Sequence, residues 1–225
     1  MSLARVSTAS GEEFAGRTLP VRPELRAVLP WPGLRRGATI ALRGSTSLLF
    51  AILASATAEG SWAAVVGLPG LSVLAAAEAG VAVERMALVP RPGTQLGEVV
   101  AALTDGLDLV AFAGTTMIST AQTRKLAARV RQRGTVLLPL GPWPSADVEL
   151  RCANGRWYGV GAGDGHLRYR EVEVHATGRG AAARPRSVRM LMPDPGGPVA
   201  LATGTGNARK DQHSPATLPI SRATG

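Results

Sequence analysis

Gly44, Ser45, Thr46 and Ser47 form a short turn between an apolar run and an apolar helical stretch, which is the setting of a phosphate-binding loop. A working loop has the pattern G-x-x-x-x-G-K-[ST], because backbone N–H groups wrap the phosphates, the Lys neutralises them and the hydroxyl holds Mg²⁺. The stretch from Gly44 to Gly60 contains no Lys and no Arg. Leu48 begins the expected helix directly after Ser47, so the turn is too short to encircle a triphosphate. We therefore predict a degenerate phosphate loop at these four residues and no nucleotide cofactor.

The residue types that hold metals or act as nucleophiles are scarce. Cys152 is the single cysteine, so no intramolecular disulfide can form, and Cys152 with three histidines cannot make a Cys/His zinc cluster. The N-terminal stretch has no apolar signal core, and the longest apolar runs fall short of the ~18 residues that indicate a membrane span. We expect a cytoplasmic protein without a metal site or catalytic residues.

The chain is strongly basic, with a formal net charge of +9 and a sequence pI of about 11.2. Such a balance often marks contact with nucleic acid or with an acidic partner. However, only Lys125 and Lys210 are lysines, so the surplus of Arg in this chain rich in Ala and Gly can also reflect codon usage. Composition alone leaves both interpretations open.

Short apolar runs alternate with helical stretches from Thr39 onward, which is typical of βα units on a mostly parallel sheet. The strands are nearly continuously apolar, as strands covered on both faces are. Ser119 with Gln122 predicts a capping box for the last helix, and Gly134 ends it. The expected strands are Thr39–Arg43, Trp62–Gly67, Met86–Val89, Leu109–Ala113 and Thr135–Leu140, and the expected helices are Leu48–Ala58, Leu71–Ala79, Leu96–Thr104 and Thr120–Arg133.

After Leu140 the residue pattern changes to one typical of antiparallel β-strands. Val148, Leu150 and Cys152 alternate with polar residues up to an expected Asn154-Gly155 turn, Leu167–His175 alternates again, and Ser187–Met192 is expected as a final edge strand. The tail is rich in Gly, Pro, Thr and Ala, which predicts disorder. We therefore expect an irregular arm over 1–33, an α/β core over 34–140, an antiparallel β-extension over 141–192 that completes one domain with the core, and a disordered tail over 193–225. We also expect the core to close without the C-terminal part.

Several motifs in order resemble RecA-type recombinases between about Leu34 and Leu140. Gly33-Leu34-Arg35-Arg36-Gly37 resembles the approach to the phosphate loop, Pro92-Gly93-Thr94 resembles a P-D-T-G segment, and Leu107–Val110 resembles the start of the Walker B strand. Ala121–Ala127 resembles the helix that follows. The resemblance implies a RecA-like, mostly parallel sheet flanked by helices.

The functional elements of that pattern are missing. Ala113 and Gly114 stand where the resemblance places the Walker B acid, and Leu68, Pro69 and Gly70 stand where it places the glutamate that activates water. The two DNA-gripping loops are replaced by short connections, Gly114–Ile118 and Gly141–Ser145. We expect Asp108 to be a strand-entry residue and not a metal ligand.

A RecA-like shell without ATP or DNA chemistry resembles the ImuA-type accessory proteins of the bacterial mutasome. The resemblance implies a non-enzymatic protein that binds a Y-family polymerase homologue and an error-prone replicative-type polymerase in mutagenesis after DNA damage. The alternatives left open are a RecA-like inhibitor of cell division and a diverged RecA-type ATPase. Self-association and weak, sequence-independent DNA binding are compatible with the first of these functions.

The C-terminal region holds the candidate contact residues. Arg156-Trp157-Tyr158 and Arg168-Tyr169-Arg170 interleave aromatics with Arg, which suits stacking on single-stranded bases or a cross-strand pair. Gly159–Gly165 resembles a nucleotide loop, but no helix follows it, so a flexible hairpin loop is expected. A basic stretch suits a phosphate backbone, an acidic partner or solvent; its members are Arg179, Arg184, Arg186 and Arg189.

Overall fold

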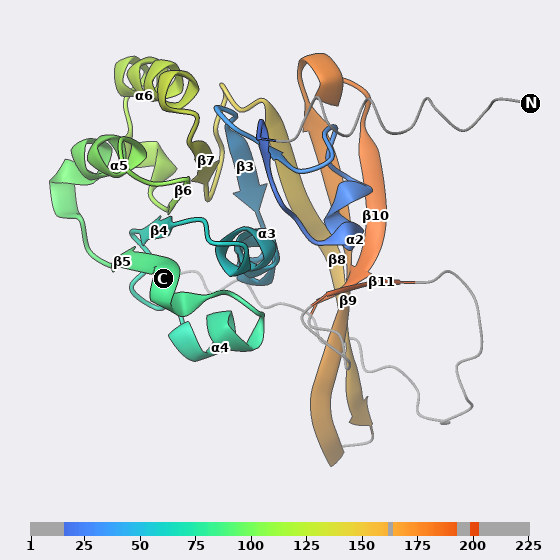
Figure 1. Cartoon of the computed structure of the whole chain (residues 1–225). Helices are drawn as coiled ribbons and strands as arrows, with labels where there is room; N and C mark the ends of the chain where they lie inside the picture. The colour runs from blue at the N-terminus through green and yellow to red at the C-terminus, as the bar shows by residue number, and fades with distance from the viewer. Residues whose placement is uncertain (1–15, 162–163, 193–198, 203–225) are drawn as a thin grey trace, which may run out of the picture.

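The computed structural model describes residues 16–161, 164–192 and 199–202, and for Asn154, 160–161 and 164–168 it describes the backbone alone. The described chain is a three-layer α/β structure with an antiparallel extension at one side of its sheet (Figure 1). The parallel strands are β3 (Ile40–Arg43), β4 (Ala63–Val66), β5 (Met86–Val89), β6 (Leu109–Phe112) and β7 (Val136–Pro139). The helices are α2 (Pro23–Arg26), α3 (Thr46–Ala58), α4 (Val73–Glu78), α5 (Leu96–Thr104) and α6 (Thr120–Arg133).

The strands lie in the order β5-β4-β6-β7-β3, followed by the extension. Parallel pairing joins β5, β4, β6 and β7 in one sheet, and two bridges, Thr39 with Leu137 and Leu42 with Leu140, join β3 to β7. The predicted parallel sheet is thus confirmed, and its strands and helices lie within two residues of the expected bounds. β5 is an edge strand, and Leu88 on it is 38% exposed, so it lacks the two-sided cover that was expected.

Two hydrophobic cores lie on the two faces of the sheet. α2, α3 and α4 cover one face, where Ile40 and Leu42 of β3 are buried, and α5 and α6 cover the other, where Val110 and Phe112 of β6 are buried. Helix α3 is apolar around most of its circumference because it is enclosed between the sheet and other elements. The predicted capping box of α6 is present, with Ser119 Oγ accepting from Gln122 N and Gln122 Oε1 accepting from Ser119 N.

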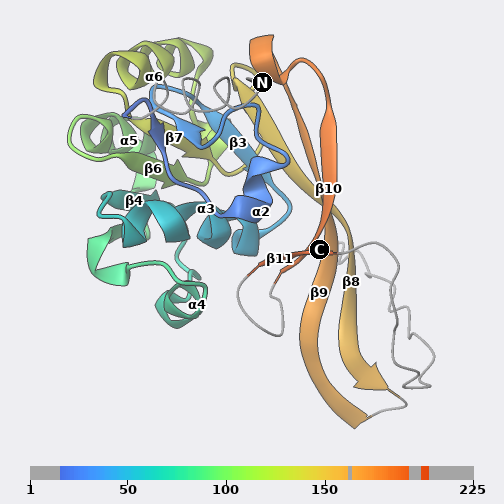
Figure 2. The ribbon, with the colours of Figure 1, turned by 45° about the vertical axis from the view of Figure 1, so that its right-hand side comes forward.

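The extension is formed by β8 (Val148–Gly161), β9 (Asp164–Gly178), β10 (Arg186–Leu191) and β11 (Ala200–Leu201). β8 runs parallel to β3, and β9 returns antiparallel to β8. Because β8 runs well past the end of β3, the far half of the β8–β9 hairpin projects beyond the helices (Figures 1 and 2). The expected flexible loop at Gly159–Gly165 is instead largely paired strand, since Val160 pairs with Gly165 and Gly161 with Asp164.

The expected Asn154-Gly155 turn is wrong. Ala153 pairs with Glu173 and Arg156 with Glu171, so β8 carries one extra residue at this point and continues as a strand through a β-bulge. An Asn-Gly pair suits a tight turn, but here the long ladder with β9 on both sides of the bulge keeps the backbone extended.

Three further expectations about the C-terminal part are wrong for the described residues. β10 is not a final edge strand, since β11 pairs with it, and residues 199–202 therefore do not belong to a disordered tail. Met190, Met192 and Val199 are buried in the core that α3 shares. The extension therefore helps to close the core, and a truncation after Ala176 would open it; residues 193–198 and 203–225 lie outside the described part of the chain.

The arm before β3 is more regular than expected. β1 (Thr18–Leu19) pairs with β2 (Leu34–Arg35), and the residues from Pro23 to Arg26 form the short helix α2, whose Leu25 is buried. Among the described residues, no helix has the length and apolar character needed to cross a bilayer.

Candidate functional site

The Gly44–Ser47 turn is closed against strand β8. Gly44 has φ +88°, and a Cβ built on it would lie 2.6 Å from the backbone oxygen of Cys152. Helix α3 begins at Thr46, and Ser45 Oγ accepts a hydrogen bond from Leu48 N at 3.4 Å. The first turn of α3 is thus capped by its own chain, with the glycine of the turn seated on β8.

Cys152, beside this turn, is not set up as a nucleophile. Its side chain is buried, and burial raises the pKa of its thiol to about 11, with Arg170 and Ser45 opposing that shift. Because the thiolate is the reactive form, the thiol is inert near neutral pH.

The two other positions that the resemblance to recombinases singles out carry no ionisable side chain. Ala113 follows β6 and donates its N–H to Val66 O, and Gly114 after it takes a left-handed conformation with φ +82°. Leu68, Pro69 and Gly70 follow β4, as the sequence indicates. Within the described part of the chain, no group of three His, Cys, Asp or Glu residues could hold a metal ion.

Asp108 has the structural role that was expected of it. Its Oδ2 accepts a hydrogen bond from Trp62 N at 2.9 Å, and its Oδ1 lies 2.9 Å from the Arg36 guanidinium. The carboxylate therefore ties the start of β6 to the start of β4 and to the turn before β3. Asp105 pairs instead with Arg129 and Arg133, and the hydrogen bond from Arg129 lowers the pKa of Asp105.

The connections that follow β6 and β7 are short. A single 3₁₀ turn, Thr115–Met117, joins β6 to α6, and Gly141–Ser145 leads from β7 toward β8. Trp143 in the second connection is 4% exposed and packs edge-on against Phe112, with ring centroids 5.3 Å apart. Trp143 is thus a core residue, and Trp31, in the segment before β3, is partly buried under Arg35.

The projecting hairpin brings Trp157 and Arg170 together as a cross-strand pair. The two residues are register partners, and the Arg170 guanidinium lies 5.9 Å from the Trp157 ring centroid. A Cβ on Gly155 would lie 2.2 Å from Arg170 Nε, so the glycine of the bulge leaves the room that this guanidinium occupies. Trp157 is 48% exposed, which leaves an aromatic face free for contact.

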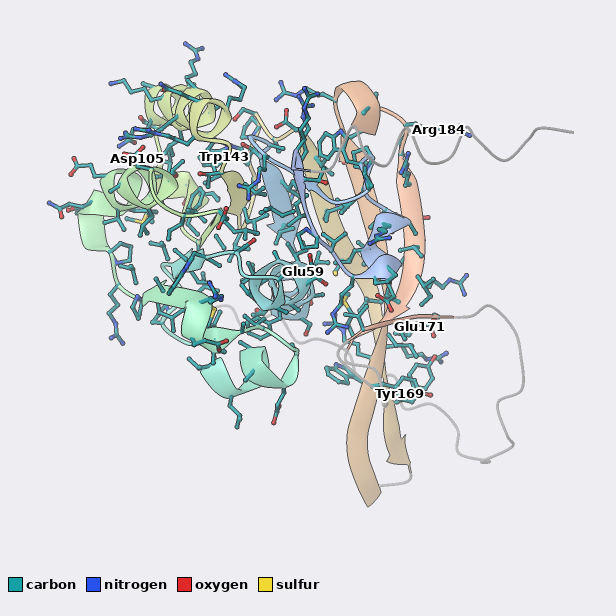
Figure 3. The ribbon with its side chains drawn as sticks, viewed as in Figure 1. Glu59, Asp105, Trp143, Tyr169, Glu171 and Arg184 are labelled. Atoms are coloured by element: carbon teal, nitrogen blue, oxygen red, sulfur yellow. The ribbon has the colours of Figure 1, made fainter. Side chains whose placement is uncertain are left out.

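The neighbouring register positions form a second cluster. Tyr158 and Tyr169 stack with centroids 4.8 Å apart, Arg156 lies 5.9 Å from the Tyr158 ring, and Tyr158 Oη donates to Glu171 Oε2 at 3.0 Å. Partial burial and this hydrogen bond raise the pKa of Tyr158. Tyr169 and Glu171 are labelled in Figure 3 on the hairpin side of the molecule. The side chain of Arg168 lies outside the described part.

The predicted basic stretch is not one surface. Arg179 donates to Ser145 O at 2.6 Å, Arg186 donates to Leu29 O, and Arg189 lies 4.0 Å from Glu171. Arg184 is exposed and lies far from Tyr169 along the sheet (Figure 3). Arg179 and Arg186 therefore fasten the extension to the core, a role that charge runs in the sequence do not reveal.

The sequence assigned Gly155 only to a turn and assigned no role to Glu171. A glycine next to Asn predicts a turn. Only the register of β8 with β9 shows that Gly155 leaves room for Arg170. Glu171 reads as one of several alternating polar residues, whereas in the fold it accepts from Tyr158 and faces Arg189.

The family match covers the α/β core. Residues 27–145 match the MT3502 N-terminal domain, a region that begins just after α2 and ends just before β8. The chain is also 37% identical over 152 residues to "Uncharacterized protein Rv3395c" of Mycobacterium tuberculosis (strain ATCC 25618 / H37Rv), an alignment that covers 67% of this chain and 71% of the relative. The domain match spans more than half of the chain, and with this relative it shows that the chain belongs to the MT3502 family.

Proposed function

We propose that this chain is a non-enzymatic, RecA-like accessory protein of the ImuA type, which binds partner proteins in error-prone translesion synthesis after DNA damage. Its partners are then a Y-family polymerase homologue and an error-prone replicative-type polymerase. The work of the protein is to hold these partners together, and no nucleotide takes part.

The observation that carries the proposal is the state of the carboxyl edge of the parallel sheet, where α/β folds bind their ligands. At that edge Gly44 is seated on Cys152 O, Ser45 caps α3, and Ala113 and Gly114 stand after β6. This edge has the strand–turn–helix arrangement of a phosphate-binding loop but no cation for phosphate and no acid for Mg²⁺. Such an edge suits a protein that retains the fold for its surfaces.

The parallel sheet supports the RecA-like part of the proposal. β6 and β7 lie between β3, which precedes the degenerate turn, and β4, the next strand along the chain. These four strands are parallel, as the resemblance to RecA-type recombinases implies. The short connections after β6 and β7 support the further point that the gripping loops of recombinases have no counterpart here.

The hairpin supports a role in partner binding. Trp157 of β8 and Arg170 of β9 belong to the hairpin, whose far half projects from the body of the fold (Figure 2). Trp and Arg are residue types enriched at the energetic centres of protein interfaces. A half-exposed Trp held against a guanidinium is already ordered, so little conformational entropy is lost when it enters a partner's pocket.

The first test concerns nucleotides. We expect millimolar ATP with Mg²⁺ to leave the melting temperature unchanged and to give no phosphate release. Stabilisation by ATP that disappears when the Gly44–Ser47 turn is altered would favour the diverged ATPase and contradict the proposal.

The second test concerns partners and has a matched control. Tagged protein from damage-treated host cells should capture the two polymerases, and Trp157→Ala should reduce their recovery at least tenfold. Trp62→Ala is the control, because Trp62 is 46% exposed and has Arg85 at 5.6 Å from its ring, but comes from the start of β4. Failure of the wild-type chain to capture either polymerase, together with cell filamentation on overexpression, would favour the division inhibitor instead.

A further inference from the structure

Helix α6 carries a dense charge of a single sign. Its sequence contains five cations and no carboxylate, and these five residues define the α6 basic face: Arg124, Lys125, Arg129, Arg131 and Arg133. The helix is buried against the sheet only through a narrow stripe at Leu126 and Val130, so the rest of its surface faces solvent. At 1.5 Å per residue its 14 residues present these charges along about 21 Å.

Only part of this charge is neutralised. Asp105 is shared by Arg129 and Arg133, whereas Arg124, Lys125 and Arg131 are exposed and have no ion-pair partner in the described part of the chain. Arg36 adjoins the end of the helix, since Gly37 lies against the backbone of Arg131, and its one carboxylate partner is Asp108. The six cations thus face two carboxylates.

A shallow surface depression lies within the basic face. It is lined by Lys125, Ala128, Arg129, Gln132 and Arg133, so three cations surround a hollow that has a small side chain on its wall. A phosphate group placed there would meet the Lys125 ammonium and the guanidinium N–H donors of Arg129 and Arg133 that Asp105 does not take.

The composition of the face distinguishes a nucleic acid from a protein partner. Protein interfaces have an apolar or aromatic core from which charged residues are depleted. No large hydrophobic side chain of α6 is exposed; among the described residues the exposed ones lie elsewhere, at Trp62, Val73, Leu74, Leu88, Met117, Trp157 and Leu201. Cations without apolar anchors are what contact with a phosphate backbone requires, because that contact is electrostatic and independent of sequence.

We infer that the α6 basic face is a binding surface for the phosphate backbone of nucleic acid, separate from the hairpin. It goes beyond the proposed protein–protein function and does not depend on it, since the residues and the ligand both differ. Affinity in the ~10⁻⁴–10⁻⁶ M range at physiological salt follows from such contacts, with steep dependence on salt and none on base sequence.

The test is a salt titration of fluorescent DNA duplexes of two unrelated sequences with the full chain. We compare the wild type with a variant that combines Arg124→Gln, Lys125→Gln and Arg131→Gln. Each lost phosphate contact makes the slope of log K against log salt shallower by about 0.9, so the variant should lose about 2–3 in slope and at least tenfold in affinity at low salt. Both sequences should behave alike.

Two controls make the result specific. Arg26→Gln, Arg91→Gln and Arg151→Gln together remove the same charge from exposed residues on other elements, and this variant should bind as the wild type does. A variant with Arg124→Lys and Arg131→Lys keeps the charge and should retain binding, which excludes misfolding as the cause of any loss. Circular dichroism should be the same for all of these proteins.

The other outcomes overturn the inference. Equal losses in the two triple variants would mean that net charge alone acts, and a wild-type chain that does not bind DNA would leave the face without this ligand. Binding of poly-glutamate as tight as binding of the duplex at equal ionic strength would indicate an acidic protein instead. A loss seen with Trp157→Ala and not with the α6 variant would move the site to the hairpin.

Discussion

Gly44→Ala tests whether the phosphate-loop turn is closed, which is the feature on which the proposed function rests. Gly44 has φ +88°, a conformation that an L-residue adopts only at a cost of about 1–2 kcal/mol. Its added Cβ would also lie 2.6 Å from Cys152 O, a backbone atom of β8 that cannot rotate away. The substitution therefore strains the backbone and pushes α3 and β8 apart.

Gly60→Ala separates these two effects. Gly60 has φ +99° and follows the end of α3, but nothing lies within 4 Å of its added Cβ. Gly60→Ala should therefore lower the free energy of unfolding by about 1–2 kcal/mol, through the backbone effect alone. Gly44→Ala should lower it by about 2–5 kcal/mol, because overpacking against a fixed neighbour adds roughly 1–3 kcal/mol.

Urea unfolding of both variants, followed by circular dichroism, measures the difference. The melting temperature gives a second readout, since 1 kcal/mol corresponds to about 2–4 °C in a chain of this length. Equal destabilisation by the two substitutions would refute the reasoning, because Gly44 would then not be seated on β8 and the turn would be free to open around a phosphate.

Three further predictions follow from the site. Asp108→Ala removes the acceptor of Trp62 N and the partner of Arg36, and should lower the free energy of unfolding by about 1–3 kcal/mol in the same urea assay. Asp108→Asn keeps an acceptor and should recover most of that free energy. Equal losses with the two substitutions would contradict the hydrogen bond. Cys152 should resist iodoacetamide at pH 8 until the chain is unfolded, and rapid labelling of the native chain would show that the thiol is not buried. Because the pKa of Cys152 rises from 9.0 to about 11 on folding, the free energy of unfolding should decline by about 2–3 kcal/mol as the pH rises from 9 to 11. A Cys152→Ser variant should lack that decline. Gly155→Ala should displace Arg170 from Trp157 and weaken polymerase capture as Trp157→Ala does. Gly70→Ala is the control and should leave capture unchanged, because nothing lies within 4 Å of a Cβ added there. Unchanged capture by Gly155→Ala would mean that the Trp157–Arg170 pair is not needed.

The sequence by itself determined the α/β core. Continuous apolar runs such as Leu109–Phe112 form strands because only burial on both faces accommodates them, and the Ser119–Gln122 capping box and Gly134 specify where α6 begins and ends. Local signals sufficed at these points because the residues that decide the conformation are neighbours in the chain. The absence of Lys after Gly44 and of an acid near Ala113 was likewise legible in the residues themselves.

Tertiary structure alone decided the strand register of the extension and the make-up of the surfaces. Asn154-Gly155 became a bulge because β9 pairs with β8 on both sides of it, and Arg179 and Arg186 became anchors because the carbonyls of Ser145 and Leu29 lie beside them in space. The basic face of α6 depends in the same way on what packs elsewhere, since Asp105 reaches only Arg129 and Arg133 and leaves Arg124, Lys125 and Arg131 to solvent. Pairing register and charge neutralisation are set by residues far apart along the chain, and a local pattern holds no information about which of them will meet.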